Sequence, residues 1–422
     1  MRIRFEYWLL ISFLLGLLIA YIVPTRIDLF FIVVDTFVAG FMFLAPVIVF
    51  VIIFDSTCSL ISERNVAGAV IKASVMYFVS LVLGCSLFAS IILSSVLVTS
   101  SSFTGLSVQT FQYVLQVMLA SLLRPVTVAL VLGVILAFAF SRSQSFRKVA
   151  DFSKQIYRAQ ERAFKLLLKV FPAIAMSLGG TLYYNLGRIS IEAYVISMSL
   201  ILILGLTALA ALFIVVQRMI HMGFGEMSRY STRLFAVGLS TGSSYVALPL
   251  ALRIFKEHFD ISESVGDLVL SLGASLNRCG SVMGVLVVTF VAARFTGFEI
   301  SWQQMLLLAI PVALIGFGSP GIQGGTLLVA MPAILYVIAP LNAAKFVAVA
   351  LALFVGGTTF IQSAVNIVAS GYVAVLVSGC ASDQTSRKAE PENQGGLRQA
   401  SRARTVRKAH VYEGAYGGVT VG

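Results

Sequence analysis

A single arginine stands in the middle of a long uncharged stretch of this 422-residue chain. Arg278 is followed by Cys279, and no other charged side chain occurs between residues 268 and 293. A guanidinium is always charged, and it can hold a carboxylate through two parallel hydrogen bonds. Placing it in hydrocarbon costs on the order of 3 kcal/mol or more, so Arg278 must face a partner or a polar cavity. We expect either an anion-binding arginine or one that clamps the carbonyls at a helix end.

Two other apolar runs are interrupted by short polar segments rich in glycine and serine. The run 233–256 breaks at Ser240–Tyr245, and the run 303–338 breaks between Gly316 and Thr326. Each flank is about 10–14 residues, too short to cross a bilayer but suited to a helical hairpin that enters and returns. Backbone at that depth must be buried in protein or line a watery cavity, so the tips predict a binding site. Close packing of helices through small residues is the alternative.

Two longer apolar runs follow these hairpins, and each has a polar interruption midway. The run 268–293 contains Ser275–Ser281, and the run 346–377 contains Thr358–Asn366. The last 200 residues or so therefore repeat a hairpin followed by a helix, the pattern of an inverted repeat around a site near the bilayer midplane.

The composition places all these segments in a membrane. Hydrophobic residues make up 59% of the chain and charged residues 11%, with a mean hydropathy of +0.96, which is too apolar for a water-soluble surface. Before the hairpins, hydropathy predicts six spans near 7–23, 29–54, 69–98, 109–140, 163–182 and 190–216. We therefore expect an all-α polytopic membrane protein with eight transmembrane helices and two re-entrant helical hairpins.

The net charge of +12 is distributed along the chain as in a membrane protein and does not indicate a nucleic-acid-binding surface. Lys and Arg fall in alternate loops, which predicts a multi-pass protein of the plasma membrane, the inner membrane in a bacterium, with both termini cytoplasmic. The basic amphipathic segment 141–169 is expected to lie on the anionic cytoplasmic leaflet, with partner binding as the alternative. Residues 381–422 should form a disordered basic tail.

The sequence shows no arrangement of residues that is typical of a catalytic site. The four cysteines have no metal-ligand spacing, and no nucleophile–base pair lies beside the polar tips. His221, His258 and His410 fall in predicted loops or in the tail. We expect no enzyme, no metal and no cofactor.

The order of these motifs resembles the dicarboxylate/amino acid:cation symporter, or glutamate-transporter, family from about Phe41 to Val377. The matching segments are the first tip at Ser243–Pro249, Asn277–Ser281 for an Asn-Met-Asp-Gly-Thr motif, the second tip at Gly321–Thr326, the last helix at Gln362–Asn366, and Lys72, Tyr77 and Ser80 in the third helix.

The resemblance implies a homotrimeric elevator-type transporter with inverted repeats, in which a transport domain slides against a scaffold. Residues 1–217 would be mainly scaffold, with helices 3 and 6 contacting or joining the transport domain, and residues 218–380 would be the transport domain. Its parts would be hairpin 1 at about 233–256, helix 7 at about 262–293, hairpin 2 at about 303–338, whose tip acts as a gate, and helix 8 at about 346–378. The implied substrate-binding residues are Ser243, Ser244, Tyr245, Arg278, Ser281, Gly324, Thr326, Thr359, Gln362, Ser363 and Asn366.

The chain departs from the family at the implied cation site. Tyr77, Ser80 and Asn277 remain as neutral ligands, but Cys279 and Ser370 stand where the family has carboxylates. Sodium prefers oxygen ligands, and a thiol is a poor replacement. We expect coupling to Na+ or H+ to be weak or absent. We also expect Arg278 to replace the charge of a bound cation or to pair with the substrate's carboxylate.

The implied substrate is a small organic anion or polar solute. Thr359 stands where amino-acid carriers of the family hold the ammonium group with an acid, and Gln362 replaces an arginine that binds a side-chain carboxylate. A carboxylate without an obligatory amine, including a dicarboxylate, is therefore favoured over glutamate or aspartate. An anion-conducting channel and a transport-inactive sensor or scaffold are the alternatives.

Overall fold

Every regular element in the described part of the chain is a helix. The chain divides into two compact units, Met1–Ser378 and Gly379–Gly422. The expected all-α class is confirmed, whereas the division into a scaffold and a transport domain stays a prediction. The computed structural model describes residues 5–23, 27–64, 66–96, 112, 115–116, 125–143, 146–167, 169–186, 190–220, 223–259, 263–319, 325–338, 343–354 and 358–388.

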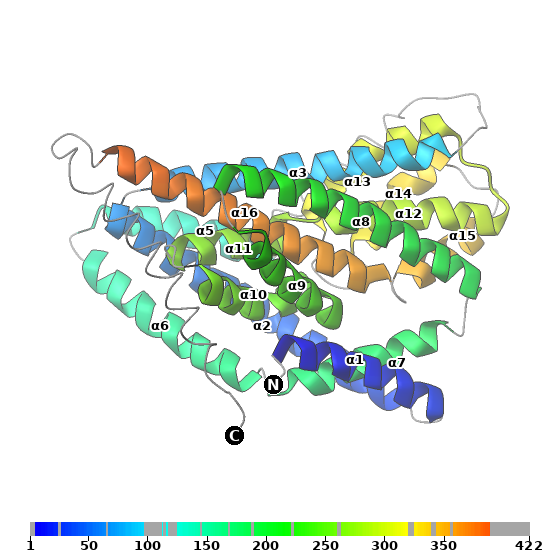
Figure 1. Ribbon diagram of the computed structural model, residues 1–422, viewed down its shortest axis with the longest axis horizontal. Coiled ribbons are helices and arrows are strands. Elements are labelled where there is room, and N and C mark those ends of the chain that lie inside the picture. Colours follow the sequence, from blue (N-terminus) through cyan, green and yellow to red (C-terminus); the bar gives the residue numbers. More distant parts are fainter. Residues whose placement is uncertain are drawn as a thin grey trace, which may run out of the picture. The chain divides into compact units, whose positions relative to one another are not determined.

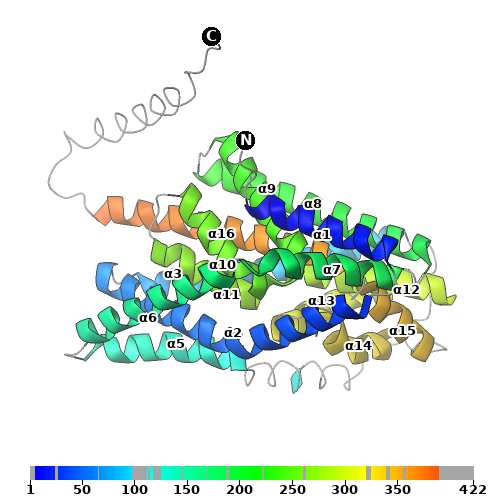
Figure 2. The same ribbon diagram turned by 90° about the horizontal axis from the view of Figure 1, so that it is seen from below.

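The first half of the chain forms long apolar helices and one polar helix. Figures 1 and 2 show α1 beside α7 and α5 beside α2, and both pairs pack directly together. In chain order the helices are α1 (Phe5–Ile22), α2 (Ile27–Arg64), α3 (Ala67–Ser95), α5 (Pro125–Ser141), α6 (Phe146–Leu167), α7 (Phe171–Leu186) and α8 (Ile191–Ile220).

Most of the predicted spans agree with these helices, and one is shifted. The span expected at 163–182 is instead α7, which begins at Phe171. The apolar end of α6 extended the hydropathy window, whereas Pro172 favours the first turn of a new helix. Part of the span expected at 109–140 lies outside the described residues.

The second half consists of two helical hairpins, each followed by a broken helix. Helices α9 and α10 pack together as the first hairpin, and α13 and α14 as the second. A helix pair lies at each place where a hairpin was predicted, and the chain breaks at Arg278, whereas the re-entrant character of the hairpins stays a prediction. The bounds are α9 (Phe224–Thr241), α10 (Ser244–His258), α11 (Glu263–Leu276), α12 (Cys279–Thr296), α13 (Trp302–Gly318), α14 (Gly325–Ile338), α15 (Ala343–Leu353) and α16 (Thr359–Lys388).

The first hairpin starts earlier than predicted, at Phe224 and not at residue 233. The charged residues before residue 233 favour a loop by average hydropathy, but this stretch forms the amphipathic start of α9. Met227, Tyr230 and Leu234 recur at helical spacing and are fully buried, while Arg229 is exposed.

The last helix differs from the prediction at both ends. The break precedes Thr359, so Gln362–Asn366 lie in the first turns of α16 and not in an interruption. Hydroxyls of Thr358 and Thr359 donate to the carbonyl of Phe354 at 3.1 and 2.6 Å, which satisfies the end of the preceding helix. The helix then runs on through residues 381–388, part of the expected disordered tail, because this stretch contains no proline or glycine to end it.

Burial separates the helices that carry the polar interruptions from those around them. Among the described residues, four stretches are long and apolar enough to cross a membrane: α3, α8, Ser264–Thr296 (α11 with α12) and α16 up to Gly379. The chain itself buries 83% of the apolar window of α11–α12 and all of that of α16, but only 33% for α3 and 28% for α8. The polar segments thus lie at the centre of the first unit, and the count of eight spans stays a prediction.

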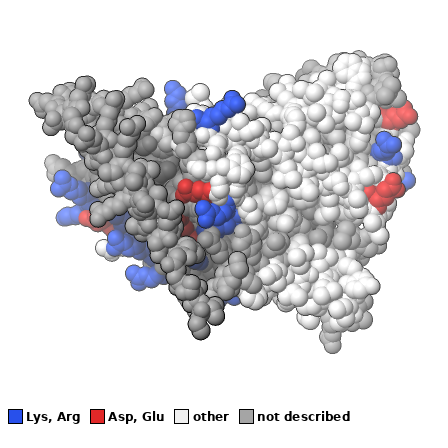
Figure 3. Space-filling model, viewed as in Figure 1, with Lys and Arg blue, Asp and Glu red and all other residues white. Residues whose placement is uncertain are grey.

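Helix α6 has the amphipathic character expected of segment 141–169. Its basic residues Arg147, Lys148, Lys154 and Arg158 are exposed, and Figure 3 shows Lys and Arg gathered at the end of the view where Figure 1 places α6. Its buried face carries Ala150 and two paired polar residues: Ser153 donates to Asp55 at 2.5 Å, and Tyr157 donates to Asp267 at 2.6 Å. Its contact with a lipid leaflet stays a prediction.

Candidate functional site

The tip of the first hairpin is a tight reversal between α9 and α10. Gly242 adopts the left-handed conformation (φ 60°) that glycine tolerates best, and its N–H bonds to the carbonyl of Gly238. Ser243 is the N-cap of α10, but its side chain does not cap the helix. The first N–H groups of α10 therefore receive no side-chain cap from Ser243.

An ion pair joins the two arms of this hairpin at the opposite end. Buried Arg233 on α9 donates to Glu257 on α10 at 2.7 Å, and Arg253 donates to the other carboxylate oxygen at 2.8 Å. Partial burial raises the pKa of Glu257, but the hydrogen bonds and charges of the two arginines outweigh it. The pKa of Glu257 therefore lies below its ordinary value.

A small polar pocket lies where the hairpin tip meets the two broken helices. Its volume is about 10 Å³, close to the space of one water molecule. The structure brings most of the predicted substrate-binding residues to this pocket, and their role in binding stays a prediction. The lining residues are Gly242, Ser243, Ser244, Arg278, Ser281, Thr326, Phe354, Thr359, Gln362, Ser363 and Asn366.

The lining comes largely from the beginnings of helices. Within the described chain, first-turn residues of α10, α12, α14 and α16 contribute Ser244, Ser281, Thr326 and Thr359. A helix N-terminus carries a partial positive charge, roughly half an elementary charge in the simplest description. The C-terminal ends of α9 and α15 also border the pocket at Gly242 and Phe354. Hydroxyls of Thr358 and Thr359 already occupy the carbonyl of Phe354.

Arg278 supplies the formal charge of the pocket. It lies between α11 and α12 and is 3% exposed, with its guanidinium carbon 5.5 Å from the centre of the Tyr245 ring. Within the described residues, its Nε and Nη2 have no hydrogen-bond partner, and neither has the buried hydroxyl of Ser244. A buried donor without a partner is unfavourable by about 1–3 kcal/mol, and more when it is charged. Among the described residues, no acceptor is present for these groups.

No carboxylate among the described residues lines the pocket. The acid before Arg278 on the same broken helix is Asp267, about 16 Å away along the axis at roughly 1.5 Å per residue. That carboxylate is held by Lys256 at 3.3 Å and by Tyr157. Within the described residues, neither a carboxylate nor a helix carbonyl accepts a hydrogen bond from the Nε or Nη2 of Arg278.

The neutral side chains of the pocket are largely committed to one another. Gln362 donates to Thr358 at 3.0 Å, and Thr326 shares a 2.9 Å hydrogen bond with Ser319 across the second hairpin. Asn366 donates to Ser281 at 3.0 Å and accepts from the N–H of Gly280 at 2.7 Å. They shape the pocket, and its fully buried atoms without a hydrogen-bond partner among the described residues are Nε and Nη2 of Arg278 and the hydroxyl of Ser244.

Three residues of the predicted cation site gather beside the pocket around Asn366. The Asn277 amide donates to the Asn366 carbonyl at 2.8 Å and to Ser370 at 3.0 Å, and Ser370 donates to the same carbonyl at 2.8 Å. The Cys279 thiol lies 3.7 Å from the Asn366 amide oxygen. Internal donors therefore occupy the oxygens that could ligate a cation, and these side chains add no negative charge.

Comparison with known proteins identifies the chain. A model of the sodium:dicarboxylate symporter family matches residues 5–380. The chain belongs to the sodium:dicarboxylate symporter family. The resemblance inferred from the hairpin tips and broken helices is confirmed, and it extends over nearly the whole described chain. The sodium:dicarboxylate symporter match makes this a multi-pass membrane protein and a secondary transporter, not an enzyme.

The relatives of this family member are named for two classes of substrate, amino acids and C4-dicarboxylates. The serine/threonine transporter SstT of Acinetobacter baylyi is 23% identical over 352 residues, 78% of this chain and 85% of that protein. The C4-dicarboxylate transport protein of Burkholderia orbicola is 25% identical over 281 residues, 65% of this chain and 62% of that protein. The SstT of Campylobacter jejuni is 22% identical over 317 residues, 69% and 74% of the two chains.

Not every residue proposed for this family member reaches the pocket. Ser80 is exposed on α3, and Tyr77 is only partly buried there; the α3 side chain that approaches Ser370 and Gly273 is Phe78. Gly324 lies outside the described residues.

Two lining residues, Gly242 and Phe354, were missed by the sequence analysis. The Thr-Gly-Ser sequence of the first tip signals a turn at Gly242. An isolated phenylalanine such as Phe354 carries no such signal.

Proposed function

We propose that this protein carries a small organic anion, which it binds through one carboxylate at Arg278 and Ser244. The observation that supports the proposal is a fully buried guanidinium with two nitrogens that lack a hydrogen-bond partner among the described residues. A carboxylate has the charge and the two oxygens to satisfy Nε and Nη2 together. The first turns of α10, α12, α14 and α16 favour the same charge.

The absence of a carboxylate from the described lining argues against a required ammonium group on the substrate. Thr359, the residue that would have to hold it, already donates to Phe354. Hydroxyl and amide groups of Ser363 and Gln362 suit a neutral polar group or a second carboxylate. We therefore infer that hydroxy acids and C4-dicarboxylates fit better than serine or threonine, although relatives are named for both classes.

Coupling to Na+ or H+ is proposed to be weak or absent. The Asn366 carbonyl, the oxygen at the centre of the candidate cation cluster, accepts hydrogen bonds from Asn277 and Ser370. A cation there would displace both donors and lie near Arg278 without a nearby anionic ligand. The elevator movement, the homotrimer, the two cytoplasmic termini and the gate role of the second tip are proposed from the resemblance alone.

A binding screen of the purified full-length protein tests this function. Thermal unfolding would be followed with succinate, L-malate, L-lactate, L-serine and L-threonine, each with sodium or with choline as the cation. We expect stabilisation by the carboxylates without amines, equal in the two salts. Stabilisation by serine or threonine alone, or a strict sodium requirement, would contradict the assignment. Counterflow of the best-bound compound in liposomes distinguishes a carrier from a channel, and lack of any binding favours a sensor or scaffold.

A further inference from the structure

The pocket without substrate holds one uncompensated positive charge. Arg278 is buried, and the described lining contains no Asp or Glu to neutralise it. Asp267 lies about three helical turns away and is already paired with Lys256 at 3.3 Å. The contact with the Tyr245 ring stabilises the guanidinium without changing the net charge.

A bound carboxylate changes this charge state. A monocarboxylate converts the buried arginine into an ion pair, and two of its donors that lack partners become hydrogen-bonded. Moving a bare charge through an apolar interior is far less favourable than moving a compensated pair. The loaded pocket should therefore cross between the two sides of the membrane much more readily than the empty one.

A co-transported cation could not relieve this imbalance. A cation in the Asn277–Asn366–Ser370 cluster would add to the charge of Arg278 instead of cancelling it. The neighbouring Cys279 carries a neutral thiol group, whose sulfur lies 3.7 Å from the amide oxygen of Asn366. The species that can neutralise the pocket is an anion.

We propose that the protein is an obligatory anion exchanger. Arg278 allows the pocket to reorient across the membrane when a carboxylate occupies it, and it prevents this reorientation when the pocket is empty. The proposal rests on carboxylate binding at Arg278, as proposed above. One carboxylate enters for each one that leaves. Exchange of two monocarboxylates moves no net charge, because the loaded pocket is neutral in both directions.

Uptake into liposomes that contain the purified full-length protein tests the exchange. Uptake of [14C]L-lactate and of [14C]succinate would be measured with the same unlabelled compound inside or with none, in chloride-free sulfate buffer. We expect initial rates at least tenfold higher in the loaded liposomes. For lactate, a potassium–valinomycin potential should leave the exchange rate unchanged. Equal uptake into loaded and unloaded liposomes would overturn the exchange proposal.

Two variants at one position separate charge from side-chain shape. Arg278→Lys keeps the positive charge and should keep the ratio of loaded to unloaded uptake at saturating substrate. Arg278→Gln removes the charge and should lower that ratio toward one, even though its total uptake falls. A ratio that stays high in Arg278→Gln contradicts the role of the charge. If this variant does not fold, the ratio in the unmodified protein decides.

The binding screen keeps the two proposals apart. Carboxylate binding with equal uptake in loaded and unloaded liposomes leaves the proposed function intact and removes the exchange. No carboxylate binding and no uptake in either kind of liposome removes the proposed function, and the exchange with it.

Discussion

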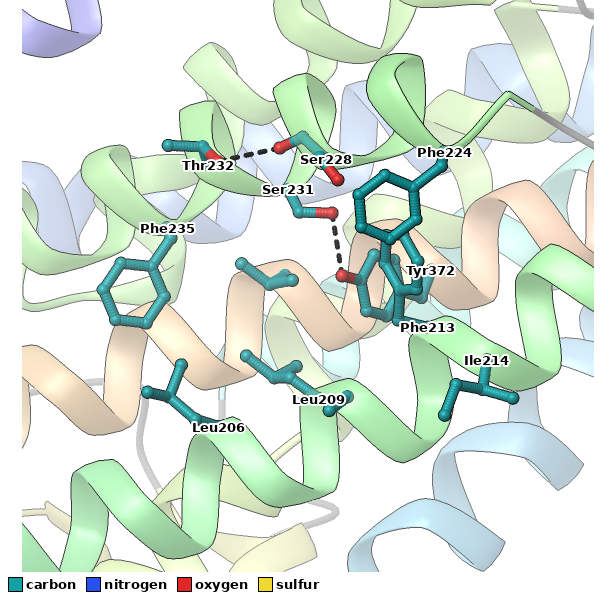
Figure 4. Close-up of a pocket in the computed structure, with 12 residues that line it drawn as sticks. Leu206, Leu209, Phe213, Ile214, Phe224, Ser228, Ser231, Thr232, Phe235 and Tyr372 are labelled. Carbon is teal, nitrogen blue, oxygen red and sulfur yellow. Dashed lines mark hydrogen bonds between the residues drawn. The ribbon is translucent and has the colours of Figure 1, made fainter.

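The first unit contains two hollows of opposite character that share helix α16. The pocket at Arg278 has a volume of about 10 Å³ and is lined by hydroxyls, amides and one guanidinium. A groove of about 580 Å³ lies between α8, α9 and α16, and its walls are mainly aliphatic and aromatic. Figure 4 shows Phe213, Phe224 and Tyr372 together at one end of this groove and Leu206 and Phe235 at the other.

The two hollows differ in whether their polar groups are satisfied. In the groove, Ser231 and Tyr372 share a 2.7 Å hydrogen bond, and Thr232 donates to the Ser228 carbonyl at 2.8 Å (Figure 4). In the pocket, Arg278 has donors without a partner among the described residues. Apolar grooves on membrane helices are compatible with lipid, whereas an unpaired buried charge calls for a specific ligand. A buried guanidinium with unmet hydrogen-bonding capacity, and not volume, distinguishes the candidate site from the groove.

Replacing Arg278 should have the largest effect on carboxylate binding. If binding did not change, the contrast between the polar pocket and the apolar groove would fail. Arg278→Met removes a buried partner of the carboxylate, for which losses of about 2–4 kcal/mol are usual. We expect carboxylate affinity to fall on the order of 30–1,000-fold, measured by calorimetry or thermal shift. Arg294→Met is the matched control, because Arg294 is exposed on the same helix α12 and should leave affinity unchanged.

Ser244→Ala should have the next largest effect on binding. A hydroxyl that donates to a carboxylate contributes about 1.5–3 kcal/mol, so affinity should fall at least about tenfold. The hydroxyl lacks a partner among the described residues, so its removal should not lower the unfolding temperature without substrate. Equal affinity in this variant and the unmodified protein would exclude Ser244 from the carboxylate site.

Glu257→Gln tests how far the ion pair at the base of the first hairpin stabilises the fold around α9, the helix that borders both hollows. The folded-state pKa of Glu257 is below its ordinary value, so the carboxylate stabilises the fold above about pH 4.5. This contribution is lost as the pH falls through the lower folded-state pKa. The variant should be less stable at pH 7 by less than about 1 kcal/mol, because the carboxylate is partly exposed.

The difference from the unmodified protein should disappear at acid pH in thermal unfolding. Arg253→Gln, which leaves the Arg233–Glu257 contact in place, should have the smaller effect. A deficit that is the same at pH 7 and pH 4 would contradict a role for the ionised carboxylate.

Ser231→Ala should have the smallest effect on transport. It tests the comparison at the apolar groove, which Ser231 lines, instead of at the pocket. It removes one partner of Tyr372, so stability should fall by about 0.5–1.5 kcal/mol. Carboxylate affinity should stay within about twofold of the unmodified protein, since the groove is not the anion site. A loss of affinity as large as that of Ser244→Ala would show that the two hollows are coupled.

The sequence predicts the broken helices well because the breaks have strong local causes. Glycine and serine at the tip before Tyr245, and polar residues around Arg278, interrupt apolar runs that otherwise satisfy their own backbone. The start of α9 was not predictable from hydropathy, because buried Tyr230 and exposed Arg229 alternate within one polar-looking stretch. Amphipathic periodicity carries that information, and average hydropathy discards it.

The candidate site was predictable in its residues but not in its hydrogen bonding. Residue types and the family resemblance identify Arg278, Gln362 and Asn366. Only the three-dimensional arrangement reveals that Asn366 is committed to Gly280 and Ser281, while two nitrogens of Arg278 have no partner among the described residues. Ser80 illustrates the limit of motif matching, since its place in the third helix turns it outward.

Three glycines limit which parts of the protein can move. A Cβ on Gly280 would lie 2.4 Å from the Gln362 carbonyl oxygen, and one on Gly284 would lie 2.4 Å from the Gln362 amide. On α9, a Cβ on Gly238 would lie 2.4 Å from the Cα of Ala364. Helices α9 and α12 therefore each approach α16 too closely for a larger side chain at these glycines. If the protein moves during transport, we expect these three helices to move together, with the hinges in the segments that join them to the rest of the chain.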